Sequence, residues 1–297
     1  MKFSSENLEL FLAVLDHGSF SAAARALRRV PSAVSMNIGN IEAELGFPLF
    51  SRTNRAVEPT ALALALAPHA RLIGRQLRDL NVHADQLANG LESTLAIAIT
   101  EDMGADHVFS ALATLSTRYP LLDIEILSVP QDEAIRLLRT GRVSLSIAYG
   151  GVMVSDSEYF QTIGEETLVA TISPDHPVLE NSDGAFYLEE LIDVRQIVVA
   201  NKESPIADHR PLVAASSWST NSFRAALGLV LKGAGWGNFP LSIIRPLISE
   251  GRLRQLLLKN TTSGLLLQKQ AIWSKREPLR KGANELLQLL LDVSKAG

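Results

Sequence analysis

Apolar residues in the first 45 positions recur at the spacing of α-helices. One set occupies a single helical face and comprises Leu8, Phe11, Leu12 and Leu15. A later set has the same period and comprises Val34, Ile38, Ile41 and Leu45. Between them, residues 22–28 suit a short helix with Ser19 or Ser21 as its N-cap, and glycines follow the first and third helices. Three short helices, the last two joined by a tight turn, predict a helix-turn-helix.

The pattern then changes twice. Residues 48–57 have no helical period and carry Arg52 and Arg55 between apolar residues, which predicts a hairpin, or wing, that presents cations. A heptad seam follows, and its members are Pro59, Ala63, Leu66, Ala70, Ile73, Leu77, Leu80, Ala84 and Leu87. A seam this regular favours a partner helix from a second subunit over packing on its own domain. We therefore expect a homodimer joined through this helix.

From residue 93 onward, predicted strands and helices alternate. The first set comprises strands at 95–99, 122–127 and 143–149, and helices at 106–118 and 132–139. The second set comprises strands at 167–172, 196–200 and 265–273, a strand or turn at 236–239, and helices at 222–232 and 278–293. Crossovers of about a dozen residues predict a parallel sheet. Two such sets predict a two-lobed α/β module with a ligand cleft between the lobes.

Composition narrows the class of protein. The chain has 297 residues, of which 46% are hydrophobic, and this suits about two globular domains. It has no cysteine, which excludes a disulfide scaffold, a thiol nucleophile and a thiolate metal site. The first apolar stretch is interrupted by Glu9, and no run of about 18 apolar residues occurs. We therefore expect a cytoplasmic protein without a membrane span.

Charge is unevenly distributed along the chain. The formal net charge is −4, which alone argues against nucleic acid as a partner. Residues 19–78, however, contain eight arginines and three glutamates and carry +5, so the remaining residues carry −9. A basic module attached to an acidic body is consistent with nucleic-acid binding by the module.

Enzymatic motifs are missing from the sequence. The six histidines are scattered, without a pair at metal-ligand spacing. Neither a nucleophile elbow nor a phosphate-binding loop occurs, and the glycine-rich segment at 233–237 lacks the spacing of a dinucleotide fingerprint. We expect neither catalysis nor a bound metal or cofactor.

An ordered set of N-terminal residues resembles the LysR-type transcriptional regulators. Its members are Phe11, Val14, Gly18, Ser19, Phe20, Ser21, Ala23, Ala24, Leu27, Ser32, Ala33, Val34, Ser35, Ile38, Ile41, Glu42, Leu45, Gly46, Pro48, Leu49, Phe50 and Arg52. Later segments that resemble the same family are Tyr119-Pro120, Gly233 to Pro240, Gly251 with Leu253, and Trp273. The sequence departs from the commonest family pattern at Val30-Pro31, Met36, Asn37, Ala63 and Ser144.

The resemblance implies an α plus α/β architecture with three parts. These are a winged helix-turn-helix at 1–58, a dimerising linker helix at 59–90, and an effector domain at 91–297 that resembles periplasmic binding proteins. Lobe I would comprise about 91–162 and 264–297, and lobe II about 163–263. The resemblance further implies a homotetramer that binds double-stranded promoter DNA, with RNA polymerase as a further partner.

Two groups of residues are expected to contact DNA. The N-terminal part of a recognition helix reaches base edges in the major groove, and its exposed side here carries Ser32, Ser35, Met36 and Asn37. Cations in the turn and wing are placed for phosphates or a minor groove, and they are Arg28, Arg29, Arg52 and Arg55.

The effector residues follow from the resemblance. They are residues after the strands, namely Thr100, Ser128 and Tyr149 in the first lobe and Asn201 in the second. Thr220 and Asn221 precede a helix whose N-terminal amides favour an anion, so a carboxylate effector is expected. Trp218 and Trp236 suit either the core or the cleft wall.

Two alternatives remain open at this point. A solute-binding protein would use only the two-lobed module, and the recognition helix and missing signal peptide argue against it. A regulator without an effector is the second alternative, and substitutions at Thr100 and Thr220 would test it.

Overall fold

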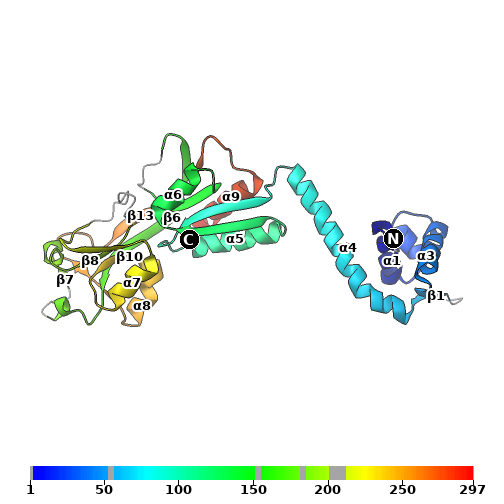
Figure 1. Ribbon diagram of the computed structural model, residues 1–297, viewed down its shortest axis with the longest axis horizontal. Coiled ribbons are helices and arrows are strands. Elements are labelled where there is room, and N and C mark those ends of the chain that lie inside the picture. Colours follow the sequence, from blue (N-terminus) through cyan, green and yellow to red (C-terminus); the bar gives the residue numbers. More distant parts are fainter. Residues whose placement is uncertain (1–2, 53–56, 151–154, 181–184, 201–211, 297) are drawn as a thin grey trace. The chain divides into compact units, whose positions relative to one another are not determined.

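The computed structural model describes residues 3–52, 57–150, 155–180, 185–200 and 212–296. They belong to two compact units, Met1–Asn89 and Gly90–Gly297 (Figure 1). Within these ranges, no helix combines the length and apolar character needed to cross a membrane.

The first unit contains three short helices, a hairpin and a long helix. In chain order they are α1 (Ser5–His17), α2 (Phe20–Ala26), α3 (Pro31–Leu45), β1 (Phe50–Arg52), β2 (Val57–Pro59) and α4 (Ala61–Ala88). Gly18 ends α1 and Gly46 ends α3, both in the left-handed conformation that costs glycine least. The side chain of Ser19 caps α2. The predicted helix-turn-helix and antiparallel hairpin are confirmed.

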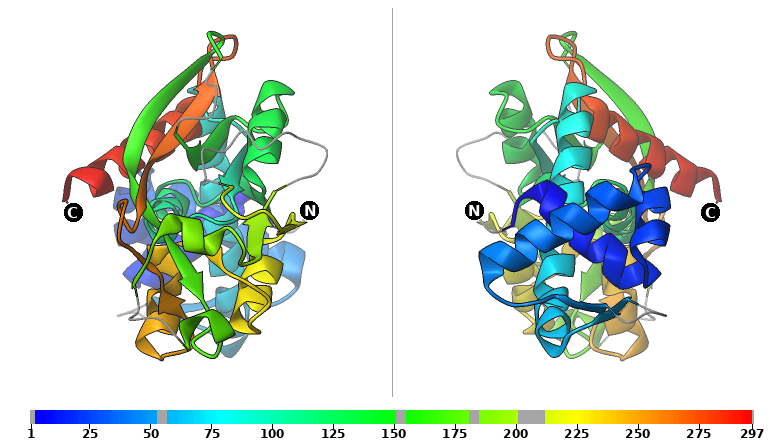
Figure 2. Two further views of the ribbon diagram at one scale, coloured as in Figure 1. Left: turned by 90° about the vertical axis from the view of Figure 1, so that its left-hand side faces the viewer. Right: turned by 90° about the vertical axis from the view of Figure 1, so that its right-hand side faces the viewer.

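Helices α1, α2 and α3 share one hydrophobic core (Figure 2, right, blue). Ala23 and Ala24 on α2 are fully buried, and their small side chains allow close packing against α1 and α3. The carboxylate of Glu42 on α3 accepts hydrogen bonds from the backbone N–H groups of Leu49 at 2.7 Å and Phe50 at 3.0 Å. Glu42 therefore anchors the start of the wing to α3.

The predicted heptad seam of α4 divides into two halves. Ala63 and Ala70 belong to the core of the first unit, so this part of the seam packs on its own domain. Farther along, Ile73 and Leu80 are more than half exposed and Leu87 is 40% exposed. The expectation of a partner helix along the whole seam is thus corrected for its first half, which is filled by α1.

The second unit is built on a mixed sheet. Its elements are β3 (Thr94–Thr100), α5 (Asp106–Arg118), β4 (Asp123–Val129), α6 (Gln131–Arg139), β5 (Leu145–Tyr149), β6 (Glu158–Ile172), β10 (Gly237–Pro240), β11 (Arg254–Gln255), β13 (Leu265–Ser274) and α9 (Lys281–Ala296). The strand order is β10-β6-β13-β5-β3-β4, and β11 also pairs with β6. Within this sheet β3 pairs in parallel with β4 and β5, whereas every pair that involves β6, β10, β11 or β13 is antiparallel, so the prediction of a parallel sheet is wrong for these four strands.

The remaining elements of this unit lie between β6 and β13 in the chain. They are two short 3₁₀ helices (Pro177–Leu179 and Leu188–Leu191), β7 (Ala185–Phe186), β8 (Gln196–Val199), β9 (Ser217–Thr220), α7 (Phe223–Leu231), α8 (Leu241–Ser249) and β12 (Leu257–Leu258). The sequence predicted α7 and β8 but missed α8, β9 and the three two-residue strands.

Strands β6 and β13 lie side by side over most of their length (Figure 2, left, green and orange). One stretch of β13 pairs with β5 on its other edge, and one stretch of β6 pairs with β10 and β11. The register shifts between Lys269 and Gln270 of β13, opposite Gly164. We call the part around β3, β4 and β5 lobe I and the part around β8, β10, α7 and α8 lobe II, because each has its own cores.

Candidate DNA-binding surface and effector cleft

The outer side of α3 carries the four side chains predicted to read bases. Met36 is 63% exposed, Ser32 is also exposed, and Ser35 and Asn37 are half-buried. The opposite side of the helix is buried and comprises Val34, Ile38 and Ile41. A buried apolar face thus fixes α3 while its outer side faces solvent.

The turn before α3 presents two exposed arginines. Arg28 has φ 53°, and it is the one non-glycine residue with positive φ in the described part of the chain. The guanidinium of Arg29 lies 2.5 Å from the carboxylate of Glu6 on α1. This ion pair is open to solvent and therefore contributes little to stability.

The wing carries the other predicted cations. Arg52 is the last residue of β1, where it pairs with Val57 of β2. Arg55 lies in the loop between these strands, outside the described residues.

A cavity of about 410 Å³ lies between the two lobes of the second unit. Its lobe I wall comes from the ends of β3 and β4 and from the start of α5, and its lobe II wall from α8. The lining residues are Ile99, Thr100, Glu101, Met103, Gly104, Ala105, Asp106, Phe109, Ile126, Ser128, Ser242 and Ile243. We call this cavity the interlobe cleft. Its volume suits a small organic molecule.

Glu101 links the two lobes at this cleft. Its Oε1 accepts a hydrogen bond of 2.6 Å from the backbone N–H of Phe223, the first residue of α7. Burial raises the pKa of Glu101, the Phe223 hydrogen bond lowers it, and the neighbouring charge of Asp102 raises it. Sequence reasoning missed Glu101, although it directly follows Thr100.

A buried ion pair stands behind the cleft wall. Glu166 on β6 and Lys269 on β13 are 5% and 8% exposed, and Nζ of Lys269 lies 3.6 Å from Oε2 of Glu166. The Lys269 ammonium also donates to the Gly104 carbonyl at 3.2 Å, and the Ser242 hydroxyl donates to Glu166. The pair therefore connects the central strands to α8 and to the loop before α5.

Burial also lowers the pKa of His107 on α5, and the positive charge of Lys269 lowers it further, whereas Asp106 and Glu166 raise it.

The structure brings together only part of the predicted effector set. Thr100 and Ser128 line the cleft, and the buried hydroxyl of Thr100 donates to the Ile147 carbonyl at 3.1 Å. Tyr149 lies elsewhere, because its ring is buried in the core of lobe I and its hydroxyl donates to the Asp102 carbonyl at 2.8 Å.

The other members of the set belong to lobe II. Thr220 accepts a hydrogen bond from the Ser222 N–H, and Asn221 is exposed beside it. Neither is among the cleft-lining residues, but Glu101 reaches the α7 N-terminus that follows them. Asn201 is outside the described residues. Of the two tryptophans left open, Trp236 is buried, and Trp218 is 47% exposed and stacks under Arg195.

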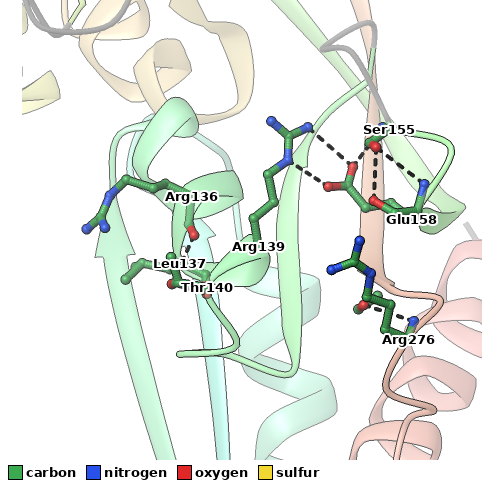
Figure 3. Close-up of polar contacts among 9 residues, drawn as sticks. Arg136, Leu137, Arg139, Thr140, Ser155, Glu158 and Arg276 are labelled. Carbon is green, nitrogen blue, oxygen red and sulfur yellow. Dashed lines mark hydrogen bonds and ion pairs between the residues drawn. The ribbon is translucent and has the colours of Figure 1, made fainter.

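A second hollow in lobe I, of about 520 Å³, is lined by arginines, whereas the interlobe cleft is lined by Glu101 and Asp106. It lies at the C-terminal end of α6, and its ionisable lining residues are Arg139, Arg276, Arg280 and Glu277, so positive charge predominates. We call it the arginine hollow. Nε of Arg139 donates at 2.7 Å to the carboxylate of Glu158, which also accepts from the Ser155 N–H (Figure 3). Glu158 is 5% exposed, so a buried carboxylate holds the Arg139 guanidinium in place.

Known proteins share both parts of this chain. Residues 5–64 match the family described as bacterial regulatory helix-turn-helix protein, lysR family, and residues 88–295 match the LysR substrate binding domain. The HTH-type transcriptional regulator AceR of Acinetobacter baumannii is 31% identical over 97% of this chain and 96% of its own. PunR of Escherichia coli is 27% identical over 87% of this chain and 84% of its own.

Solved structures show the same fold. CbnR, a LysR family transcriptional regulator, has a TM-score of 0.56 at 18% identity and covers 97% of this chain and 100% of its own. ArgP from Mycobacterium tuberculosis has a TM-score of 0.53 at 19% identity, with 97% and 96% covered.

A helix-turn-helix followed by a two-lobed α/β module with a cleft defines a ligand-responsive DNA-binding protein. The chain belongs to the LysR family of transcriptional regulators. Its N-terminal helix-turn-helix is the DNA-binding part and its C-terminal module is the effector-binding part.

Proposed function

We propose that residues 1–58 bind promoter DNA with α3 in the major groove, and that Ser32, Ser35, Met36 and Asn37 contact base edges. Arg28, Arg29, Arg52 and Arg55 contact phosphates or a minor groove. The observation that carries this proposal is the outer side of α3, where polar and flexible side chains face solvent over a buried core. Arg29 exchanges the Glu6 carboxylate for a phosphate on binding, which costs little because the ion pair is exposed.

Residues 59–90 act as the dimerising linker. The exposed seam residues on α4 that support this role are Ile73, Leu80 and Leu87, which follow one another at intervals of seven residues. Residues 91–297 bind the effector in the interlobe cleft, with Thr100 and Ser128 in its wall. The regulator assembles as a homotetramer in the cytoplasm, acts without catalysis, and contacts RNA polymerase at the promoter.

Selection of bound duplexes from a random pool by the purified full chain tests the DNA assignment. We expect recovery of an inverted repeat and an affinity that falls steeply with salt. Asn37→Ala should relax base preference at one position by about 1–3 kcal/mol, whereas Arg52→Ala should weaken binding to all sequences and lower the salt slope by about one. Arg252→Ala is the matched control, because it removes an exposed arginine from the second unit. Equal loss of specificity from Asn37→Ala and Arg52→Ala would contradict the assignment.

A further inference from the structure

The interlobe cleft is negatively charged. Among the described residues that line it, Glu101 and Asp106 are ionisable, and none is lysine, arginine or histidine. Its remaining wall is largely apolar, through Met103, Phe109, Ile126 and Ile243. Phe109 and Ile126 are 53% and 44% exposed, so both offer apolar surface.

The protein itself supplies an anion at the N-terminus of α7. The N-terminal amides of a helix attract negative charge, and the Glu101 carboxylate already accepts the Phe223 N–H at 2.6 Å. A carboxylate effector at this place would have to displace Glu101 and would lie beside its like charge. The residues of the cleft therefore oppose the carboxylate effector that the sequence suggested.

A comparison with Glu92 shows that Glu101 is more than a helix cap. Both oxygens of Glu92 accept backbone N–H groups at the start of α9, at 2.8 Å from Gly282 and from Ala283, and the residue is 5% exposed. Glu101 uses Oε1 alone, and its Oε2 has no hydrogen-bond partner among the described residues. Since Glu101 also lines the cavity, one carboxylate oxygen remains for a ligand.

The buried cation behind the cleft wall forms its ion pair with another carboxylate. Lys269 is committed to Glu166 and to the Gly104 carbonyl, behind the cleft wall. Within the described part of the chain, neither Glu101 nor Asp106 forms an ion pair. Glu101 is half-buried and Asp106 is exposed, so water partly screens both charges, and a positively charged ligand that displaces this water forms a close charge pair with them.

We propose that the effector is an alkylammonium compound, that is, a protonated amine on an apolar chain or ring. The ammonium lies against Glu101 and Asp106, and the hydrocarbon part packs on Phe109, Ile126 and Ile243. This inference rests on the proposed role of the interlobe cleft. It also gives the ligand a means of signalling, because it contacts α8 of lobe II and the carboxylate that joins lobe I to α7.

Calorimetric titration of the full chain with three probes of equal length tests the ligand class. Hexylammonium, hexanol and hexanoate differ in charge but share the hydrocarbon chain. We expect hexylammonium to bind about tenfold or more tightly than the other two, which corresponds to one close charge pair. Glu101→Gln should remove that preference while leaving hexanol binding unchanged. Asp106→Asn is a second variant with the same expected direction and a smaller effect.

The controls separate this inference from the proposed function. Arg276→Gln changes charge in the arginine hollow and should leave all three titrations as in the unsubstituted protein. Preference for hexanoate would overturn the alkylammonium class while supporting the cleft as a binding site. Absence of binding by all three probes, with operator binding intact, would overturn the inference and leave the DNA function standing. If the unsubstituted full chain failed to bind any operator, that result would instead count against the proposed function.

Discussion

The interlobe cleft and the arginine hollow lie in the same unit but carry opposite charges. Part of this difference comes from the helix end that lies at each hollow. Asp106 lies in the first turn of α5 and Arg139 in the last turn of α6, and each sign of charge is favoured at that helix end. Helix electrostatics thus explain one charge in each hollow. They do not explain the second carboxylate oxygen of Glu101, which accepts no hydrogen bond from the described residues and is the candidate for ligand recognition in the cleft.

The two hollows also differ in how their ion pairs are buried. Both partners of the Glu166–Lys269 pair behind the cleft are at least nine-tenths buried. In the arginine hollow Glu158 is equally buried, but the Arg139 side chain is 48% exposed. A charge left alone in the interior costs far more than one that water reaches. The cleft should therefore be the more sensitive of the two to loss of one partner.

Lys269→Met has the largest expected effect on stability. It leaves Glu166 buried without its cation, and the free energy of unfolding should fall by about 3–5 kcal/mol. Urea unfolding of the full chain, followed by circular dichroism, measures this loss. The double variant Glu166→Gln with Lys269→Met removes both charges and should recover a large part of it. Equal instability of the single and double variants would show that packing, not charge, sets the cost.

Gly104→Ala tests the close approach between the cleft loop and α8. A Cβ at residue 104 would lie 2.2 Å from Oγ of Ser242 and 2.9 Å from Oε2 of Glu166. Relief requires Ser242 to leave Glu166, so unfolding free energy should fall by about 1–3 kcal/mol.

Gly228→Ala is the matched control, because Gly228 lies inside α7 and a Cβ there meets no atom within 4 Å. That substitution should stabilise the protein by about 0.5–1 kcal/mol. Thermal unfolding midpoints that move in the same direction for both variants would contradict the close-approach argument.

Glu158→Gln has a smaller expected effect, in the arginine hollow. It weakens the charge-assisted hydrogen bonds to Arg139 and to the Ser155 N–H, and the expected loss is about 1 kcal/mol because Arg139 can hydrate. Glu125→Gln removes an ion pair in which both side chains are substantially exposed, that of Glu125 with Arg142, and should leave the unfolding midpoint unchanged. If Glu125→Gln were the more damaging of the two, burial would not be the deciding factor.

Sequence reasoning found elements with regular periods and missed those defined by distant contacts. Residues 106–118 were predicted as a helix and form α5 with these bounds. Helix α8 was missed because it contains Pro246, a residue that ordinarily interrupts a helix. The first half of β6 was missed because Tyr159 and Phe160, which are adjacent, are both about half exposed and break the alternation of a half-buried strand.

The sequence predicted only those residues of the cleft that lie at the end of a single strand. Thr100 is the last residue of β3 and Ser128 is the last but one of β4, so the strand pattern of the local sequence identified them. Glu101 accepts a hydrogen bond from Phe223, a residue 122 positions away, and neither local sequence contains a pattern that predicts this contact. Tyr149 also ends a strand, but its side chain points into the core of lobe I. Successive side chains of a strand point to opposite faces, so a difference of one residue decides between core and cleft.

The smallest expected effect is a pH dependence of the free energy of unfolding that arises from Glu101 in the interlobe cleft. Because burial raises the pKa of Glu101, the folded state binds a proton more readily than the unfolded state as pH falls below neutral. Ionised Glu101 therefore weakens the fold at neutral pH, and its contribution becomes more favourable as pH falls through the raised pKa. Glu101→Gln should flatten this part of the stability profile, measured by urea unfolding between neutral pH and the ordinary range of a glutamate.

An ammonium ligand should act in the opposite direction, because it favours ionised Glu101 and lowers its pKa. Hexylammonium affinity should consequently decline as the solution becomes acidic enough to protonate this carboxylate. The charges that modulate the decline are those of Asp102 and Asp106 beside Glu101, of the Glu166–Lys269 pair behind the wall, and of His107 on α5, which interacts electrostatically with Asp106 and with that pair. Arg276→Gln, in the arginine hollow, should show the same decline as the unsubstituted protein, whereas Glu101→Gln should lose most of it. A decline that survives in Glu101→Gln would assign the titrating group to another residue and place the ammonium elsewhere in the cleft.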